Sequence, residues 1–160
     1  MGLPVSLTLA AVLSFSAFAV EPANKEGEAM KAKDNARIKQ VVDDWIPALQ
    51  SGSVDRNAAF YANDVVIAGE GSWGVYVGLA QVRGMLEKLL GDTSPTECSI
   101  EVLGVEITGD WAELRARFKA VWQPKSEGIE VERESSNYIW LLKRQPDDSW
   151  KIVRFLFYSS

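Results

Sequence analysis

The chain has 160 residues, of which 47% are apolar, and a formal net charge of -5 at pH 7. This length fits one domain with a substantial core. The acidic balance argues against nucleic acid and against an anionic membrane surface as partners, because both require clustered Lys and Arg. Histidine is absent, so the usual general acid and base near pH 7 and the commonest zinc ligand are missing. We therefore expect no histidine-dependent mechanism, no metal site and no cofactor.

The N-terminal segment has the pattern of a cleaved export signal. Residues 1–19 are apolar, and the small side chains of Ala17 and Ala19 flank Phe18, as at a signal-peptidase site. The usual positive charges are missing, and a retained anchor is the alternative, although the run is short for a membrane span. The single cysteine, Cys98, is expected to be a free, partly buried thiol. Export without disulfides predicts a bacterial periplasmic or secreted protein that has no membrane attachment after cleavage.

Helical patterns fill the first half of the remaining chain. Residues 20–34 are polar, and we expect a mobile leader or the frayed start of the first helix there. The domain itself is expected over residues 35–160. Three helices should lie in its first part, at residues 38–49, 53–61 and 79–90. The first and third of them carry apolar side chains at helical spacing.

Four long strands are predicted after the helices, at residues 98–108, 111–123, 130–144 and 149–159. Apolar and charged side chains alternate strictly in the second of them, which is typical of a half-buried strand. Its apolar positions are Ala112, Leu114, Ala116, Phe118, Ala120 and Trp122. The three alanines indicate room for an interior cavity. Helices followed by adjacent long strands predict an α+β fold with a curved antiparallel sheet.

Several local motifs resemble the nuclear transport factor 2-like superfamily, and within it the SnoaL-like and kinase-association-domain-like group. They lie at Val41–Trp45, Ser51–Asp55, Phe60–Val66 and Trp140–Ile152, so that the likeness covers about residues 36–160. The resemblance implies a cone-shaped sheet of cystatin-like, ketosteroid-isomerase-like architecture with a pocket that opens toward the first helix. It also implies a homodimer formed through the outer face of the sheet. The superfamily includes both enzymes and binding modules, so the fold alone decides little about function.

Comparison with the ketosteroid isomerases argues against isomerase chemistry. Gly69 occupies the position of their general base, with Glu70 next to it, and Trp45 replaces their first oxyanion donor. Their second donor is an Asp on the penultimate strand. That strand offers only Glu130, Glu132 and Glu134 before its apolar run. We take Glu70 as the candidate catalytic base, and a solvated loop carboxylate is the alternative.

Two functions stay open at this point. The first is an exported, cofactor-free protein that binds a neutral apolar or aromatic metabolite in the cone. Acid/base chemistry of the isomerase, cyclase or hydratase class would then rest on Glu70, assisted by Trp45 or Tyr138. The candidate ligand-binding residues are Trp45, Tyr61, Ala116, Phe118, Tyr138, Trp140 and Phe155.

The alternative is a non-catalytic homodimeric binding or assembly module, whose cavity is filled by Phe155 and Phe157. In the SnoaL-like group an Asp commonly occupies the place of Phe155, which favours this alternative. If both phenylalanines point inward, an apolar patch remains on the outer face of the sheet. The residues expected there are Ile152, Leu156, Tyr158, Ile139 and Leu141.

Overall fold

The computed structural model describes residues 25–160, so the predicted export signal at residues 1–19 lies outside the described residues. These residues contain three α-helices: α1 (Lys25–Gln50), α2 (Val54–Ala58) and α3 (Leu79–Asp92). The strands of the first half are β1 (Tyr61–Gly69) and β2 (Gly74–Val77), joined by the short 3-10 helix η1 (Gly71–Trp73). The second half contains β3 (Thr93–Thr108), β4 (Trp111–Pro124), β5 (Glu132–Arg144) and β6 (Trp150–Ser159).

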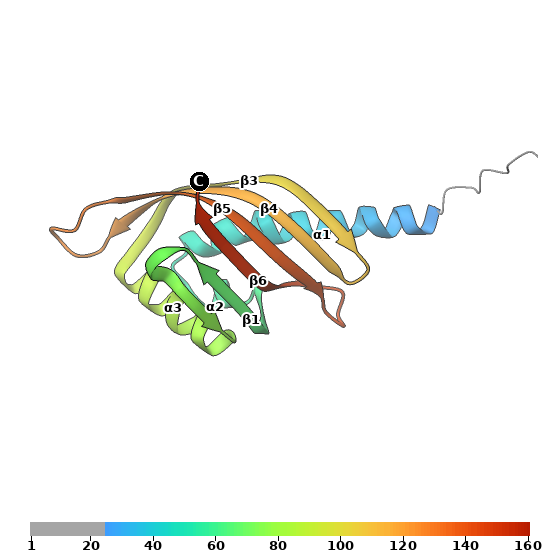
Figure 1. Cartoon of the computed structure of the whole chain (residues 1–160), viewed down its shortest axis with the longest axis horizontal. Helices are drawn as coiled ribbons and strands as arrows, with labels where there is room; N and C mark the ends of the chain where they lie inside the picture. The colour runs from blue at the N-terminus through green and yellow to red at the C-terminus, as the bar shows by residue number, and fades with distance from the viewer. Residues whose placement is uncertain (1–24) are drawn as a thin grey trace, which may run out of the picture.

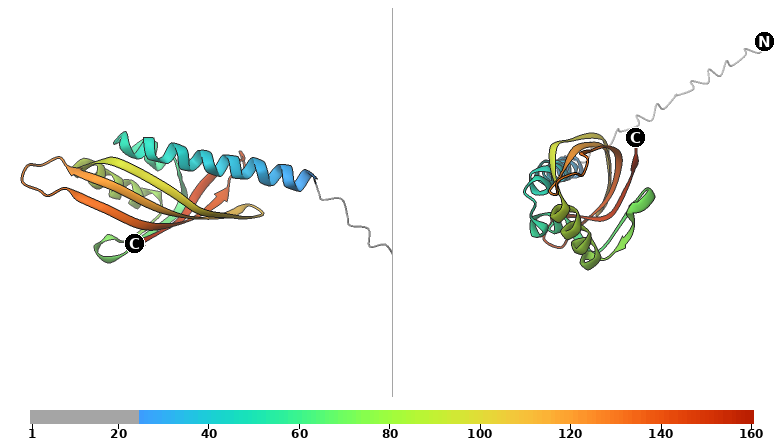
Figure 2. Two further views of the ribbon diagram at one scale, coloured as in Figure 1. Left: turned by 90° about the horizontal axis from the view of Figure 1, so that it is seen from above. Right: turned by 90° about the vertical axis from the view of Figure 1, so that its left-hand side faces the viewer.

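The six strands form one sheet in the order β2-β1-β6-β5-β4-β3. Neighbouring strands are antiparallel except β1 and β6, which run parallel. The sheet is strongly bent and curls around the helices (Figures 1 and 2). The α+β prediction is confirmed, and the sheet is mixed rather than purely antiparallel.

The alternating strand predicted from the sequence is β4, and its orientation is confirmed. All six of its apolar positions from Ala112 to Trp122 are at most 6% exposed. On the opposite face Arg115 pairs with Glu106, and Arg117 pairs with Glu101. Because side chains alternate between the two faces of a strand, the pairing of β4 with its neighbours places one set in the core and the other in solvent.

A substitution at Ala116 can test how tightly the inward face of β4 is packed. It is 1% exposed and lies opposite Tyr138 of β5. We expect Ala116→Phe to lower the free energy of unfolding by about 1–3 kcal/mol, because the added ring overpacks the core. The measurement is urea denaturation, with Lys119→Phe on the outer face of β4 as the control. An Ala116→Phe variant as stable as the control would show that space remains beside the alanine.

Helix α1 begins at Lys25, ahead of the domain boundary that was predicted at residue 35. Residues 25–34 are therefore the start of the first helix, which was one of the two alternatives for this segment. The sequence did not clearly predict a helix at residues 25–34, because this segment has few apolar side chains. No helix within residues 25–160 is both long enough and apolar enough to cross a bilayer.

One predicted orientation in β6 is wrong. Ile152 was expected on the outer face, but it is fully buried, and Val153 is buried beside it. The pairing of β5 with β6 shifts register between Leu141 and Leu142, so β6 has one extra residue there and Ile152 packs in the core. Beyond this irregularity the expected alternation holds, with Leu156 45% exposed.

Candidate functional site

A small cavity lies inside the cone, between α1, α3 and the concave face of the sheet. Its volume is about 50 Å³, which is room for about one or two water molecules. Seven aromatic residues form most of its wall: Trp45, Tyr61, Trp73, Trp122, Tyr138, Phe155 and Phe157. Aliphatic side chains from α1, α3 and β1 complete the wall together with a single charged residue, Glu134. The cone interior is therefore aromatic and nearly filled by its own side chains.

The structure brings part of the predicted site together. Four of the seven candidate ligand-binding residues lie on the cavity wall: Trp45, Tyr61, Tyr138 and Phe155. The other three, Ala116, Phe118 and Trp140, are buried but do not line it. The space that the alanines seemed to leave is taken up by large neighbours, because the ring of Trp45 packs against the edges of Phe118 and Trp140.

Glu70, the candidate base, does not line this cavity. Its side chain is exposed, and its Oε2 accepts a hydrogen bond from the backbone N–H of Ser159 at 2.9 Å. The backbone N–H of Glu70 in turn donates to the carbonyl of Phe157 at 3.2 Å. These contacts fasten the turn after β1 to the end of β6.

Glu134 is the carboxylate that reaches the cavity. One of its oxygens accepts a hydrogen bond from Nε1 of Trp122 at 2.9 Å, and the other accepts from the Tyr138 hydroxyl at 3.0 Å. Burial raises the pKa of Tyr138 well above its ordinary value, and the charge of Glu134 and their hydrogen bond add to this effect. Tyr138 therefore stays protonated and acts as a donor to Glu134.

Sequence reasoning missed the role of Glu134 because three glutamates precede the apolar run of β5. The signal that could have found it is strand alternation. Glu134 is in phase with Tyr138 and Trp140, which both point inward. Glu132 has the same phase, but it lies near the end of the strand and is exposed.

A second polar group faces the cavity from β1. Nε1 of Trp45 donates to the hydroxyl oxygen of Tyr61 over a long distance of 3.5 Å. Burial raises the pKa of Tyr61 to about 12, partly offset by the hydrogen bond from Trp45. Within residues 25–160 the Tyr61 hydroxyl finds no acceptor for its own hydrogen. The cavity wall thus carries a carboxylate acceptor and a neutral hydroxyl donor.

Trp73 of η1 lines the cavity and is itself only partly buried. Its ring packs edge-on against Phe157, with centroids 5.4 Å apart. Gly69 lets the Phe157 ring and the Cβ of Trp73 approach the backbone of β1, because a Cβ at this position would overlap both. Gly71 and Gly74, which flank the turn, both have positive φ. Trp73 is therefore a wall residue carried on a short glycine-flanked turn rather than on a helix or long strand.

Cys98 is a free, half-buried thiol, as the sequence predicted. Its pKa is raised to about 11, mainly by burial and further by the charge of Glu134. Only the thiolate reacts with alkylating agents, so we expect Cys98 in the folded protein to be modified far more slowly than in urea at about pH 8. Mass spectrometry after timed iodoacetamide treatment measures this ratio. Equal rates in the folded and unfolded protein would contradict it.

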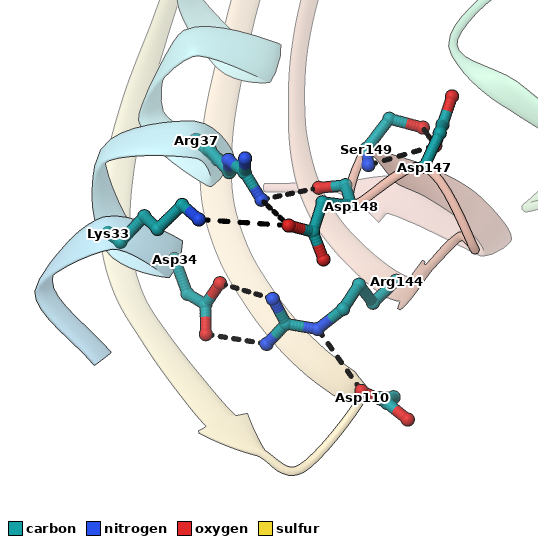
Figure 3. Close-up of polar contacts among 8 residues, drawn as sticks. All are labelled: Lys33, Asp34, Arg37, Asp110, Arg144, Asp147, Asp148 and Ser149. Atoms are coloured by element: carbon teal, nitrogen blue, oxygen red, sulfur yellow. Dashed lines mark hydrogen bonds and ion pairs between the residues drawn. The ribbon is translucent and has the colours of Figure 1, made fainter. Parts of the chain in front are cut away.

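A separate polar cluster ties α1 to two turns of the sheet (Figure 3). Both terminal nitrogens of Arg144 donate to the Asp34 carboxylate at 2.6 Å, and its Nε donates to Asp110 at 3.1 Å. Arg37 pairs with Asp148 at 3.2 Å, and this contact lowers the pKa of Asp148. Both arginines are thus paired with carboxylates of the described chain. No group of three or more metal-ligating side chains occurs in the described part of the chain.

Comparison with known proteins agrees with this architecture. A bent, mostly antiparallel sheet wrapped on N-terminal helices defines the cystatin-like, nuclear transport factor 2-like class of folds. Residues 30–155 match the SnoaL-like domain. The chain therefore belongs to the SnoaL-like domain family, as the sequence motifs had indicated. No curated protein sequence matches the chain.

Solved structures with the same fold are distant in sequence. A ketosteroid isomerase-like protein from Erwinia carotovora atroseptica is 20% identical, with 78% of this chain and 94% of that chain covered and a TM-score of 0.68. A conserved protein from Planctomyces limnophilus is 17% identical, with 81% of this chain and 98% of that chain covered and a TM-score of 0.72. A nuclear transport factor 2-like protein with a cystatin-like fold from Novosphingobium aromaticivorans is 17% identical. The match covers 88% of this chain and 91% of that chain, with a TM-score of 0.67. At this identity the matches establish the fold and not an activity.

Proposed function

We propose that this protein binds a small apolar or aromatic molecule in the cone cavity. The observation that carries the proposal is a cavity wall of seven aromatic residues with one carboxylate and no Lys or Arg. Ligand sites are typically apolar and hold a few polar groups that orient the ligand. Glu134 and the Tyr61 hydroxyl are such groups. The wall also offers one general base, Glu134, so acid/base chemistry at this site would rest on it rather than on Glu70.

Binding requires the cavity to widen, because about 50 Å³ is too small for an aromatic molecule. Trp73 is the wall residue best placed to move. It is only partly buried, and its turn is flanked by glycines. We infer that the ligand displaces the Trp73 ring from Phe157 and then packs between Trp45, Tyr138 and Phe157.

The six tryptophans of the chain supply local probes for a test with benzyl alcohol. Their indole N–H resonances can be followed in proton–nitrogen correlation spectra while the compound is added. We expect the signals of Trp45, Trp73 and Trp122 to shift, because these residues line the cavity. The signal of Trp111, which is exposed on β4, should stay in place and serves as the internal control.

A Trp73→Ala variant extends this test, with Trp111→Ala as its matched control. Removing this ring should leave benzyl alcohol binding intact and admit larger compounds such as naphthalenemethanol, whereas Trp111→Ala should behave as the wild type. If benzyl alcohol shifts no cavity tryptophan in the wild type or in Trp73→Ala, the binding function is wrong.

A non-catalytic homodimeric module is the second candidate, and the small size of the cavity favours it. An apolar row crosses the outer face of four strands where Val75, Ala68, Leu156 and Ile139 are register partners. We propose that two copies of the chain pack through this row. Light scattering should then give a dimer mass that Leu156→Glu reduces to a monomer. Ile129→Glu, an exposed apolar position outside the row, is the control, and a monomeric wild type would refute the dimer.

Export remains a prediction from the sequence. We propose that residues 1–19 are removed and that the mature protein lies in the periplasm or outside the cell. Mass spectrometry of the protein from fractionated cells should find a chain that starts at Val20. Recovery of intact residues 1–19 in the cytoplasmic fraction would contradict this.

A further inference from the structure

We propose that the ligand of the cone cavity carries a positively charged amine, which binds Glu134. This inference rests on the proposed binding function and names the chemical class of the ligand. It revises the expectation of a neutral ligand, because the structure places a carboxylate on the cavity wall that the sequence did not reveal.

Glu134 has no counterion among the side chains of residues 25–160. It points from β5 into the cavity and is half-buried. Its two hydrogen bonds come from neutral donors, the indole of Trp122 and the hydroxyl of Tyr138. None of the ion pairs within residues 25–160 includes Glu134. A carboxylate forms its strongest hydrogen bonds with charged donors, so a cation supplied by the ligand would complete the site.

The aromatic rings of the cavity wall also suit a cation. The faces of tryptophan and tyrosine rings attract ammonium groups, and Trp is the strongest of the aromatic side chains in this respect. Three tryptophans line the cavity: Trp45, Trp73 and Trp122. An anionic ligand would meet Glu134 with no Lys or Arg on the wall to balance the repulsion. The cavity therefore discriminates by charge in favour of amines.

The two hydrogen bonds of Glu134 also orient its carboxylate for this role. Each oxygen is held by one donor and retains a further lone pair. An ammonium group brings three donors and can use those lone pairs without displacing Trp122 or Tyr138. The carboxylate is thus positioned before the ligand arrives, which lowers the ordering cost of binding.

The experiment compares three probes of similar shape: benzylamine, benzyl alcohol and benzoate. Affinities come from the shifts of the Trp122 and Trp45 indole N–H signals. We expect the wild type to bind benzylamine about tenfold more tightly than benzyl alcohol, which corresponds to one additional charge-assisted contact. Benzoate should give no shift of either signal.

Two variants test whether the preference for the amine depends on the charge of Glu134. Glu134→Gln keeps the size of the side chain and removes its charge, so the preference for the amine over the alcohol should vanish. Glu132→Gln makes the same change on the same strand at an exposed position and should leave the preference unchanged. This control also accounts for weak attraction of any cation to a protein of net charge -5.

The outcomes separate this inference from the function on which it rests. If benzyl alcohol binds as tightly as benzylamine in the wild type, the amine proposal is wrong and the binding function stands. An amine preference that survives in Glu134→Gln overturns the assignment to Glu134. If no probe binds the wild type or Trp73→Ala, both proposals fall. The wild-type comparison needs no variant, so the test holds even if Glu134→Gln folds poorly.

Discussion

Replacing Arg144 with methionine should lower the free energy of unfolding by about 3–5 kcal/mol, because it leaves a buried carboxylate without its partner. The Asp34 residue is 2% exposed. Both of its oxygens accept hydrogen bonds from Arg144 (Figure 3). The guanidinium also lies 4.9 Å from the ring centroid of Trp150, so packing is lost with the charge. Urea denaturation near neutral pH measures the change.

Two further variants show whether the buried charge is the cause. Arg115→Met removes a cation from the exposed pairs with Glu106 and Glu113 and should cost less than about 1 kcal/mol. In the double variant Asp34→Leu with Arg144→Met no unpaired carboxylate remains, so much of the lost stability should return. If Arg144→Met and Arg115→Met cost the same, this ion pair does not hold α1 to the sheet.

Replacing Trp45 with alanine should also lower the free energy of unfolding by about 3–5 kcal/mol, because a large core side chain is lost and a cavity remains. Trp45 is 4% exposed. Its ring packs edge-on against Phe118, Tyr138 and Trp140 with centroids 5.3 to 6.1 Å apart. No other helical residue makes these ring contacts within residues 25–160. Thermal and urea denaturation measure the loss.

The control for this change is Trp111→Ala, since Trp111 is 42% exposed on the outer face of β4 and its removal should cost about 0.5 kcal/mol or less. Trp45 also lines the cone cavity, so the variant should be stabilised by benzyl alcohol more strongly than the wild type. Equal stability losses in the two tryptophan variants would show that Trp45 is not central to the core.

The sequence alone predicts which side chains of β4 are buried, but it does not predict this correctly for β6. The reason is physical. In β4 the period of two is unbroken from Ala112 to Ala120, so one alternation determines the buried face. In β6 the pairing with β5 shifts register next to Ile152, which thereby packs in the core. Such an irregularity depends on the neighbouring strand, and the local pattern of apolar residues does not reveal it.

The residues of the cavity could likewise be predicted from the sequence only in part. Four aromatic residues of the cavity wall were among the predicted ligand-binding residues, but the partners of Glu134 were not predicted. Trp122 and Glu134 lie on different strands, and their contact depends on how the sheet bends. Asp34 is a second example, because a polar residue in a polar segment is buried only through Arg144, which lies 110 residues further along the chain.

The strand order has a consequence for how the protein is made. β6 is the last strand in sequence, yet it lies in the middle of the sheet between β1 and β5. Until it emerges from the ribosome, β1 has only β2 as a partner, and the inward side chains of Val65 and Ile67 have no finished core to enter. Contacts between such distant segments form late and slowly. The nascent chain must therefore keep an apolar hairpin exposed until β6 has been synthesised, and exposed apolar strands of this kind are prone to aggregate.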